Sequence, residues 1–298
     1  MNNWPFSSNL SETSSDHSVE DVGPIQWRDR TIWTVGKRGG WPIDVVEQER
    51  REAEHHLLRI LLGHPFYERI SEILKDTSNH HRKKVLDVGT GEGTWAIEMA
   101  DLFPHIDEVA IQPVMVPPNC EMDLSKALPY PAQSLDIIHL RFLVNKVPEY
   151  LSLISQSLHL LKSGGLLLIF DNFTIPQDDL NNTPKGIQAF HDSYNRSLKT
   201  AKIQKVITED IINILRGNGE IKGDLIKVPI NHGNGRMKQL SKIHLINLKA
   251  WVESTKYMII EYGEYTDSEF DILSEAYFKD IDINQLYTCY HSLWLRKA

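Results

Sequence analysis

The chain of 298 residues is 41% hydrophobic and 24% charged, which is enough to bury one large core. Its 32 Lys and Arg against 40 Asp and Glu leave a formal net charge of −8, which argues against a broad nucleic-acid-binding surface. No apolar run is long enough for a membrane span, and the first residues lack the pattern of a secretion signal. Because Cys120 and Cys289 have no paired spacing, we expect a soluble protein in a reducing, cytoplasmic compartment.

The N-terminal part is predicted to contain a tail and a helix. Residues 1–22 are rich in Ser, Asn, Asp and Glu, which predicts a disordered tail. We expect residues 23–298 to form a single domain, in which a hairpin or loop within residues 23–80 leads into the helix. An apolar stripe along that helix predicts a lid packed over a cleft; it comprises Leu57, Leu58, Leu61 and Leu62.

Two adjacent histidines on this helix, His55 and His56, raise the question of a metal site. Neighbouring residues on a helix point about 100° apart, so these two do not form the i, i+4 pair that zinc sites use. We therefore predict no metal site, and we place His56 among the residues that contact a bound acceptor.

Residues 85–95, Val-Leu-Asp-Val-Gly-Thr-Gly-Glu-Gly-Thr-Trp, predict a buried strand, a glycine-rich turn and the start of a helix. Such a turn presents backbone N–H groups to a ligand, as nucleotide-binding sites do. The NAD fingerprint G-x-G-x-x-G does not fit, because Thr94 stands where the third glycine belongs. A phosphate loop does not fit, because no Lys-Ser or Lys-Thr follows the glycines. A tight turn without a ligand is the alternative.

Strands and helices alternate downstream. Residues 135–140 and 166–170 are apolar enough for buried strands, and residues 147–161 carry apolar residues at helical spacing. Lys162-Ser-Gly-Gly165 is typical of the turn that ends a helix. This order predicts a parallel α/β sheet. Further helices are expected at residues 187–198, 207–215, 245–251 and 270–278, and further strands at residues 224–230 and 287–295.

Several motifs resemble one protein family. The D-x-G-x-G-x-G pattern that starts at Asp87 is the form used by Rossmann-like methyltransferases dependent on S-adenosylmethionine (SAM). The flanking motifs are Trp41-Pro-Ile-Asp44, residues 47–51, His55-His-Leu-Leu58, Leu61-Leu-Gly63, Ile111-Gln-Pro113, Val116-Pro-Pro-Asn-Cys120 and Ile138-His-Leu-Arg-Phe142. Together they resemble the fungal LaeA-like methyltransferases, over most of residues 24–298.

The resemblance implies a class I α/β fold of Rossmann-like type. Such a fold has a seven-stranded, mostly parallel sheet with an antiparallel last strand, flanked by helices. The helical lid would be at residues 23–80, the cofactor-binding core at residues 81–172, and acceptor-side helices and closing strands at residues 173–298.

The resemblance also implies SAM as the cofactor and S-adenosylhomocysteine (SAH) as its product. Asp123 is expected to face the adenine amino group and Leu124 to pack on the base, with a helix N-cap or turn as the alternative for Asp123. Arg141 either anchors a carboxylate or pairs with an acidic loop residue such as Asp123. The full set of predicted cofactor contacts is Asp87, Gly89, Thr90, Gly91, Gly93, Trp95, Asp123, Leu124, His139 and Arg141.

One segment departs from the family pattern. The second strand ordinarily ends in an acidic residue that binds the ribose of SAM, whereas residues 107–113 run almost directly into the Gln-Pro motif. No carboxylate stands at the expected strand end, and a one-residue shift that recruits Glu108 would turn its side chain to the opposite face. The loss of ribose hydrogen bonds, about 1 kcal/mol or more each, predicts weaker SAM binding.

Methyl transfer depends more on alignment and exclusion of water than on acid or base groups. His139, at the carboxyl edge of its strand, is the first candidate base, with a structural histidine as the alternative. Asp171 is the second catalytic candidate, with a capping role as the alternative. The residues predicted to contact the acceptor are His56, Phe142, Asn172, Phe190 and Tyr194, with core packing as the competing role of Phe190.

The sequence therefore predicts a cytoplasmic SAM-dependent methyltransferase that transfers a methyl group to a small secondary-metabolite acceptor by direct displacement. That small molecule is its predicted partner, and neither nucleic acid nor a membrane is. Two alternatives stay open. One is a regulator that binds a partner protein, which a nuclear location would suit; the other is a repurposed cyclase or isomerase that uses the same pocket.

Overall fold

The computed structural model describes residues 22–35, 39–63, 66–75, 83–103, 110–114, 127–172 and 174–298. Three predictions fall outside these ranges. They concern the tail up to residue 21, the segment with Asp107 and Glu108, and the adenine contacts Asp123 and Leu124.

The larger of two sheets has the strand order β5-β4-β6-β7-β9-β8. Its parallel strands are β4 (Lys84–Val88), β5 (Ala110–Val114), β6 (Leu135–Arg141) and β7 (Leu161–Asn172). β9 (Leu286–Lys297) runs antiparallel to β7, and β8 (Gly219–Ile230) forms the edge, antiparallel to β9. This topology confirms the Rossmann-like α/β class. The described residues supply six strands where seven were predicted, and the chain between β5 and residue 127 lies outside them.

β7 begins earlier than predicted. Lys162-Ser-Gly-Gly165, expected as a turn, belongs to β7, which directly follows α4 (Tyr150–Leu160). The ladder pairs Leu135 with Leu161 and then Ile137 with Leu166, so residues 162–165 bulge out between the two pairs. Gly164 has a φ of +75°, which a glycine adopts without strain. The glycines thus mark a bulge within the strand as well as the end of the helix.

The buried strands separate two cores on the two faces of the sheet. Ile138 of β6 packs on one face with Leu153 of α4. Ile137 packs on the other face with Val85 of β4 and Trp95. Alternate residues of a strand face opposite sides, and both sides of β6 are covered, so its residues before Arg141 are all buried. This explains why the strand was recognisable as an apolar run.

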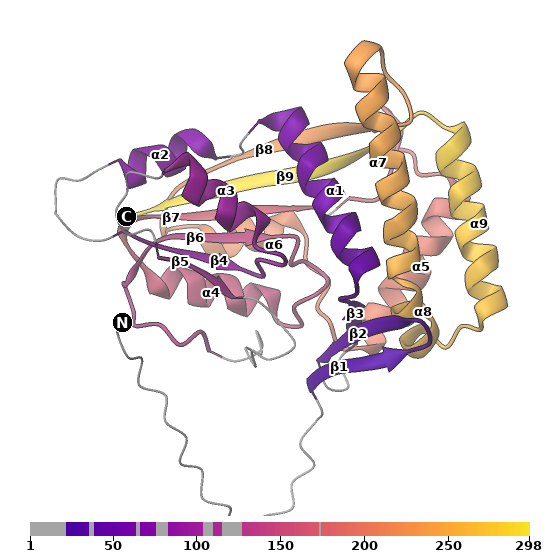
Figure 1. The fold of residues 1–298 in the computed structure, drawn as a ribbon, viewed down its shortest axis with the longest axis horizontal. Coiled ribbons are helices and arrows are strands. Elements are labelled where there is room, and N and C mark those ends of the chain that lie inside the picture. The colour runs from indigo at the N-terminus through magenta and orange to yellow at the C-terminus, as the bar shows by residue number, and fades with distance from the viewer. Residues whose placement is uncertain are drawn as a thin grey trace, which may run out of the picture.

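Helices cover both faces (Figure 1). α2 (Tyr67–Leu74) and α3 (Thr94–Leu102) lie on one face, and α4 and α6 (Thr208–Leu215) lie on the other. A further layer of helices stands beyond the carboxyl ends of the parallel strands, and its core includes Phe190, Val252 and Phe270. It contains α5 (Lys185–Thr200), α7 (Gly235–Ser254), α8 (Lys256–Gly263) and α9 (Asp267–Ile283). The helices predicted in this half of the chain are thereby confirmed.

α1 (Val45–Leu62) packs beside α7 (Figure 1). Its N-cap is Asp44, whose side chain accepts a hydrogen bond from the Glu47 N–H at 3.1 Å. Arg30 binds the same carboxylate through Nε at 2.6 Å and Nη2 at 3.0 Å. These contacts fix the start of α1 relative to the strands before it.

Those strands form a small sheet, in which the first two make the expected hairpin and the third is added to it. β1 (Val22–Trp27), β2 (Arg30–Val35) and β3 (Gly40–Pro42) are antiparallel, in that order. The sheet rests on α8, where the Gly40 N–H lies 3.3 Å from Met258 Sδ. It therefore anchors the chain just before α1.

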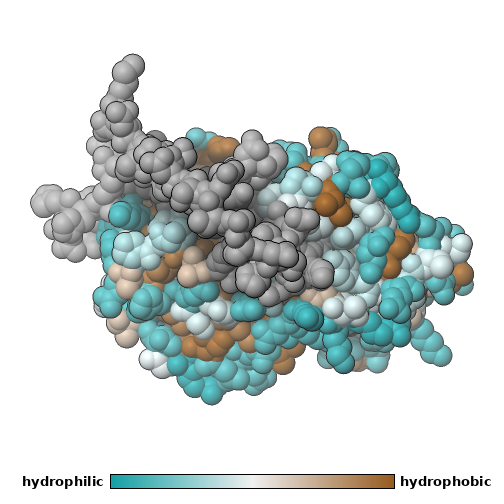
Figure 2. Space-filling view, turned by 90° about the horizontal axis from the view of Figure 1, so that it is seen from below, coloured by the Kyte–Doolittle hydropathy of each residue, from teal (hydrophilic) through white to brown (hydrophobic). Residues whose placement is uncertain are grey.

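The surface seen from below is mostly hydrophilic, with separate apolar areas between the polar ones (Figure 2). Among the helices in the described ranges, none combines the length and apolar character needed to cross a bilayer.

Candidate functional site

The glycine turn after β4 has the predicted geometry. Gly89, Gly91 and Gly93 have φ angles of +72°, +59° and +80°, values that residues with a side chain rarely adopt. Gly93 is the N-cap of α3, so the unpaired N–H groups of that helix begin at the turn. A Cβ atom at position 89 would lie 2.4 Å from Leu143 Cδ2. Glycine is therefore required there by the chain that follows β6.

Asp87, His139 and Trp95 form a buried stack below the turn. Asp87 and His139 are register partners, and Asp87 Oδ1 lies 2.8 Å from His139 Nδ1. The indole of Trp95 stacks on the imidazole with 4.0 Å between ring centroids. Burial lowers the pKa of His139, although its bond to Asp87 acts in the opposite direction. The placement favours the structural alternative for His139 over the role of a base.

Polar contacts tie α1 to the turn and to the end of β6. Arg51 Nη2 lies 3.1 Å from Glu92 Oε1 in the turn. His55 Nδ1 lies 2.8 Å from Arg141 Nη1. Burial and the charge of Arg141 lower the pKa of His55 to about 4, so the neutral ring accepts a hydrogen bond from Arg141. Arg141 thus has a partner on α1 that the sequence did not suggest.

A cavity of about 270 Å³ lies beside the turn. The segment after β6 connects the two, because Leu143 faces Gly89 while Phe142 and Lys146 line the cavity. Side chains from α1, α5, α7, β7 and β9 complete the wall; they include Glu47, Arg50, Glu54, Asn172, His191, Tyr194, Asn247, Trp251 and Tyr290. The wall is thus aromatic and polar, which suits a small ligand that is held by a few directed contacts.

Asp171, at the end of β7, holds the connecting segment in place. Its Oδ2 accepts hydrogen bonds from the N–H of Leu143 at 2.9 Å and of Val144 at 2.8 Å. Burial raises the pKa of Asp171 to about 7, and these N–H donors limit the rise. The carboxyl group thus caps the segment after β6, whereas the sequence alternative placed its capping role in the loop that follows β7; it also lines the cavity.

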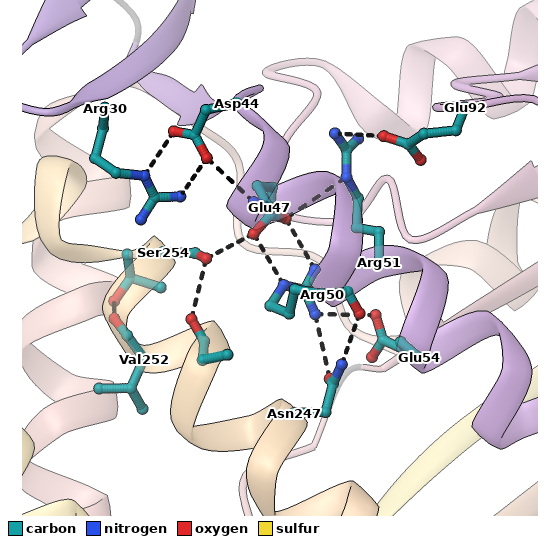
Figure 3. A network of polar contacts seen from close by, with 12 residues as sticks. Arg30, Asp44, Glu47, Arg50, Arg51, Glu54, Glu92, Asn247, Val252 and Ser254 are labelled. Carbon is teal, nitrogen blue, oxygen red and sulfur yellow. Dashed lines mark hydrogen bonds and ion pairs between the residues drawn. The ribbon is translucent and has the colours of Figure 1, made fainter.

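A buried polar network forms the α1 side of the cavity (Figure 3). Arg50 binds Glu47 through Nε and Nη2, both at 2.9 Å, and binds Glu54 through Nη1 at 3.2 Å. Asn247 of α7 accepts from Arg50 Nη1 at 3.2 Å and donates to the Arg50 carbonyl at 2.8 Å. Burial alone would raise the pKa of Glu47, but the bonds from Arg50 outweigh it and lower the pKa to about 2. The network therefore stays ionised and joins α1 to α7.

The predicted acceptor contacts divide into two groups. Phe142, Asn172 and Tyr194 line the cavity. His56 is exposed and lies 3.8 Å from Glu52 on its own helix. Phe190 is fully buried among the aromatic side chains of α7 and α9. The structure therefore brings three of the five residues together, and it places Phe190 in the core role that competed for it.

Lys146, Trp251 and the Arg50 network were not predicted. Lys146 lies five residues beyond the end of β6. Ligands of α/β folds collect at the carboxyl edge of the sheet, and this rule alone could have identified Lys146 as a site residue from the sequence. Trp251 and Arg50 carried no signal, because only the packing of α7 on α1 brings them to the cavity.

The glycine turn is suited to SAM. Thr90 Oγ1 and Asp87 Oδ2 are buried and have no hydrogen-bond partner within the described part of the chain. Among the described residues, a Cβ atom at position 91 would have only Arg51 Nη1 within 4 Å, at 3.6 Å, so these residues leave space above the turn. Together with the N–H groups of α3, these atoms would hold the polar groups of SAM. The residues present therefore fit the cofactor.

The second strand differs from the expectation. β5 continues through the Gln-Pro motif, and its last residue, Val114, pairs with Val88 at the end of β4. The strand therefore matches β4 in length and is not cut short before Gln112. Its five residues include no carboxylate, so the ribose contact of the family pattern is missing from the strand itself.

Comparisons with known proteins agree with this site. The methyltransferase domain family matches residues 54–208, which are 155 of the 298 residues and more than half of the chain. Methyltransferase str3 of Strobilurus tenacellus is 24% identical over 198 residues, which cover 62% of this chain and 68% of that protein. The secondary metabolism regulator laeA of Coprinopsis cinerea is 33% identical over 135 residues, 42% of this chain. This chain spans 33% of that regulator.

Among solved structures, phosphoethanolamine N-methyltransferase 2 of Haemonchus contortus, in complex with phosphomonomethylethanolamine and SAH, is 12% identical with a TM-score of 0.43. The similarity covers 94% of this chain and 72% of that one. The family match covers more than half of the chain and includes the glycine turn. This chain therefore belongs to the methyltransferase domain family, as a SAM-dependent methyltransferase.

Proposed function

We propose that this methyltransferase acts on a small molecule that occupies the 270 Å³ cavity. The observation that carries the proposal is the segment after β6. Leu143 of this segment faces Gly89 in the cofactor turn, and its neighbours Phe142 and Val144 line the cavity. An acceptor in the cavity would thus lie next to the turn that holds the cofactor.

SAM supplies a methyl group on a sulfonium, which is already a good leaving group. The chain then has to orient the acceptor and exclude water. The aromatic rings of Trp251 and Tyr194 line the cavity and pack edge to face, with 5.6 Å between their centroids. Such rings suit an aromatic or otherwise planar acceptor. Asp171 and His139 both have structural partners, so we assign neither as a base.

The proposal is tested first by calorimetry with SAM and SAH. We expect saturable binding of both to the wild type and its loss in Gly91→Arg, because a long side chain would fill the space above the turn. Asn195→Trp, which fills the cavity from α5, is the matched variant; it should keep SAH binding and lose transfer to any acceptor found by mass spectrometry. Absence of SAH binding at millimolar ligand, or unaltered transfer in Asn195→Trp, would contradict the proposal.

A regulatory function is the second candidate, and the similarity to the laeA regulator supports it. A regulator would bind a partner protein stably on purification, and Asn195→Trp would not affect that complex. A repurposed cyclase or isomerase would give a product with the mass of its substrate. The acceptor screen therefore separates these functions by product mass.

A further inference from the structure

Lys146 is a cation in the cavity wall that has no ion-pair partner among the residues that the structure describes. It follows β6 on the segment that faces the cofactor turn, and its side chain lines the cavity. Within the described ranges its ammonium group makes no hydrogen bond and no ion pair within 4 Å. Burial lowers the pKa of Lys146 to about 8, while the charge of Glu47 acts against this. The ammonium therefore remains the main form at pH 7, although it is largely removed from water.

The carboxylates around Lys146 are engaged elsewhere. Glu47 and Glu54 of α1 are both bound by Arg50, at 2.9 Å and 3.2 Å. Asp171 of β7 accepts hydrogen bonds from backbone N–H groups. Arg50 balances one of the two glutamate charges and lies in the same wall. None of these carboxylates forms an ion pair with Lys146, so the ammonium of this half-buried side chain is left in the cavity wall for a ligand to neutralise.

The cavity wall also contains two stacked aromatic rings and a second polar atom that has no partner among the described residues. His191 of α5 stacks on Trp251 of α7, with ring centroids 5.5 Å apart and planes at 21°. Burial lowers the pKa of His191 to about 4, so the ring is neutral at pH 7. Its Nε2 is buried and has no hydrogen-bond partner in the described part of the chain. A planar ligand could lie against these rings and bind this nitrogen.

We propose that Lys146 binds an anionic oxygen group of the acceptor, and that the acceptor is a planar aromatic acid, either a carboxylic acid or an acidic phenol. This inference rests on the proposed function, because it specifies the acceptor of that same cavity. An oxyanion would supply the missing partner of Lys146 through a charge-assisted hydrogen bond. The stacked rings of His191 and Trp251 would contact the planar part of the molecule.

The test compares acids with their neutral amides. The probes are 4-hydroxybenzoate, 1-hydroxy-2-naphthoate, the primary amide of each, and 4-nitrophenol with its methyl ether. Binding to the full chain is measured by calorimetry at pH 7, with and without saturating SAH. The variants are Lys146→Met, which keeps the length of the side chain without its charge, and Lys199→Met, in which an exposed lysine of α5 is removed as the matched control.

We expect the wild type to bind at least one acid or phenol about ten-fold or more tightly than its neutral counterpart. Lys146→Met should abolish this preference and leave the affinity for the neutral probe within about two-fold, whereas Lys199→Met should keep the preference. The carboxylic acids test whether Lys146 binds a carboxylate, and 4-nitrophenol tests whether it binds a phenolate. Lys146→Met should fold about as well as the wild type, because the side chain is half-buried and its ammonium makes no ion pair with the described residues.

Equal affinity for acids and neutral probes, or no binding of any acid in the panel, would overturn the inference. An equal loss of acid and amide binding in Lys146→Met would also overturn it, because the residue would then act through shape alone. Failure of the proposed function appears separately, as absence of SAH binding to the wild type. Binding of the acids measured without SAH tests the inference about Lys146 even if the wild type does not bind SAH.

Discussion

At position 171 a catalytic role and a structural role predict different results. The carboxyl group of Asp171 accepts hydrogen bonds from the N–H of Leu143 and Val144. Asp171→Asn keeps an oxygen for both donors, so we expect its unfolding free energy to stay within about 1 kcal/mol of wild type and transfer to be largely retained. Asp171→Leu leaves two buried N–H groups unpaired, at about 1–3 kcal/mol each. Urea denaturation and a transfer assay measure both effects.

If Asp171 instead removes a proton from the acceptor, the pattern changes. Asp171→Asn would then fold normally but lose transfer by about a hundred-fold or more. Retained SAH binding in that variant would show that the cofactor turn is intact. The two roles are therefore separated by one substitution and two measurements.

Gly89 allows a second test at the scale of one residue. Alanine there would have to adopt a φ of +72° and would bring its Cβ atom to 2.4 Å from Leu143. Gly164 has nearly the same φ, +75°, but such a Cβ atom would have no atom of the described residues within 4 Å. We expect Gly164→Ala to cost about 1–2 kcal/mol from backbone strain, and Gly89→Ala to cost more. Gly89→Ala should also lower SAH affinity by roughly ten-fold, because Leu143 or the turn must move.

Thermal unfolding and calorimetry with SAH measure these two glycine variants. Equal stability and equal SAH affinity in both would show that the contact between the turn and the segment after β6 has no energetic role. The link between cofactor turn and cavity would then lose its physical basis.

At the scale of elements, the contact of α1 with α7 depends on a buried ion network. Arg50 neutralises Glu47, and the side chains of both are 5% exposed. Arg50→Met removes the closer cation and leaves the buried Glu47 carboxylate with the longer ion pair to Arg51 Nε, at 3.7 Å, so we expect a loss of about 3 kcal/mol in unfolding free energy. Arg28→Met breaks the exposed pair with Asp267, in which the side chains are 41% and 50% exposed. That control should lose at most about 1 kcal/mol.

Urea denaturation with a common m-value compares Arg50→Met and Arg28→Met. Similar losses of unfolding free energy in the two variants would mean that water reaches the ion network. Apolar contacts alone would then hold α1 to α7.

Elements defined by local chemistry were predictable from the sequence. The strand, turn and helix around Gly89 follow from three glycines after an apolar run, and β6 follows from a mostly apolar run. β9 was expected from the resemblance to the closing strand of the methyltransferase fold. The extent of β5 was not predictable, because a Gln-Pro pair is untypical of a strand interior. The bulge in β7 was identified as a turn, because its glycines indicate where the backbone bends but not whether the ladder resumes.

The cavity wall was less predictable than the turn. Arg50 and Asn247, which meet on its α1 side, are 197 residues apart in the chain. His139 was predicted as a base from its place at a strand end, but its bond to Asp87 depends on the register of two strands. Pairings of this kind arise from tertiary packing and leave no periodic pattern in the sequence.

At the scale of the whole molecule, buried histidines in the helical half make the fold sensitive to acid. Burial is the main cause that lowers the pKa of His55 and His191 to about 4 and that of His244 to about 3. All three have an ordinary pKa of 6.5. The unfolded chain therefore binds more protons below pH 6.5, and the unfolding free energy should fall as the pH drops from about 6.5 toward 4.

Asp171 acts in the opposite direction over part of this range. Its pKa is raised to about 7 in the fold from an ordinary value of 3.8, so the folded chain takes up a proton there that the unfolded chain does not. Its contribution to stability is present at low pH and is lost as the pH rises through about 7. Between pH 4 and 6.5, these three histidines oppose one aspartate, and the lowered pKa values of His139 and His291 act in the same direction as theirs. The histidines therefore determine the sign of the slope.

Each proton changes the unfolding free energy by about 1.4 kcal/mol per pH unit, so we expect a net loss of up to about 3 kcal/mol per unit near pH 5. Urea denaturation at pH 4.5, 5.5 and 6.5 measures this slope. His244 is fully buried and lies 2.7 Å from Thr288 Oγ1 through Nε2, far from the glycine turn along the chain. His244→Gln should therefore reduce the slope by about one proton, and Asp171→Asn should increase it by about one. An unchanged slope in His244→Gln would mean that His244 is already protonated in the folded chain. Burial would then lower its pKa much less than expected.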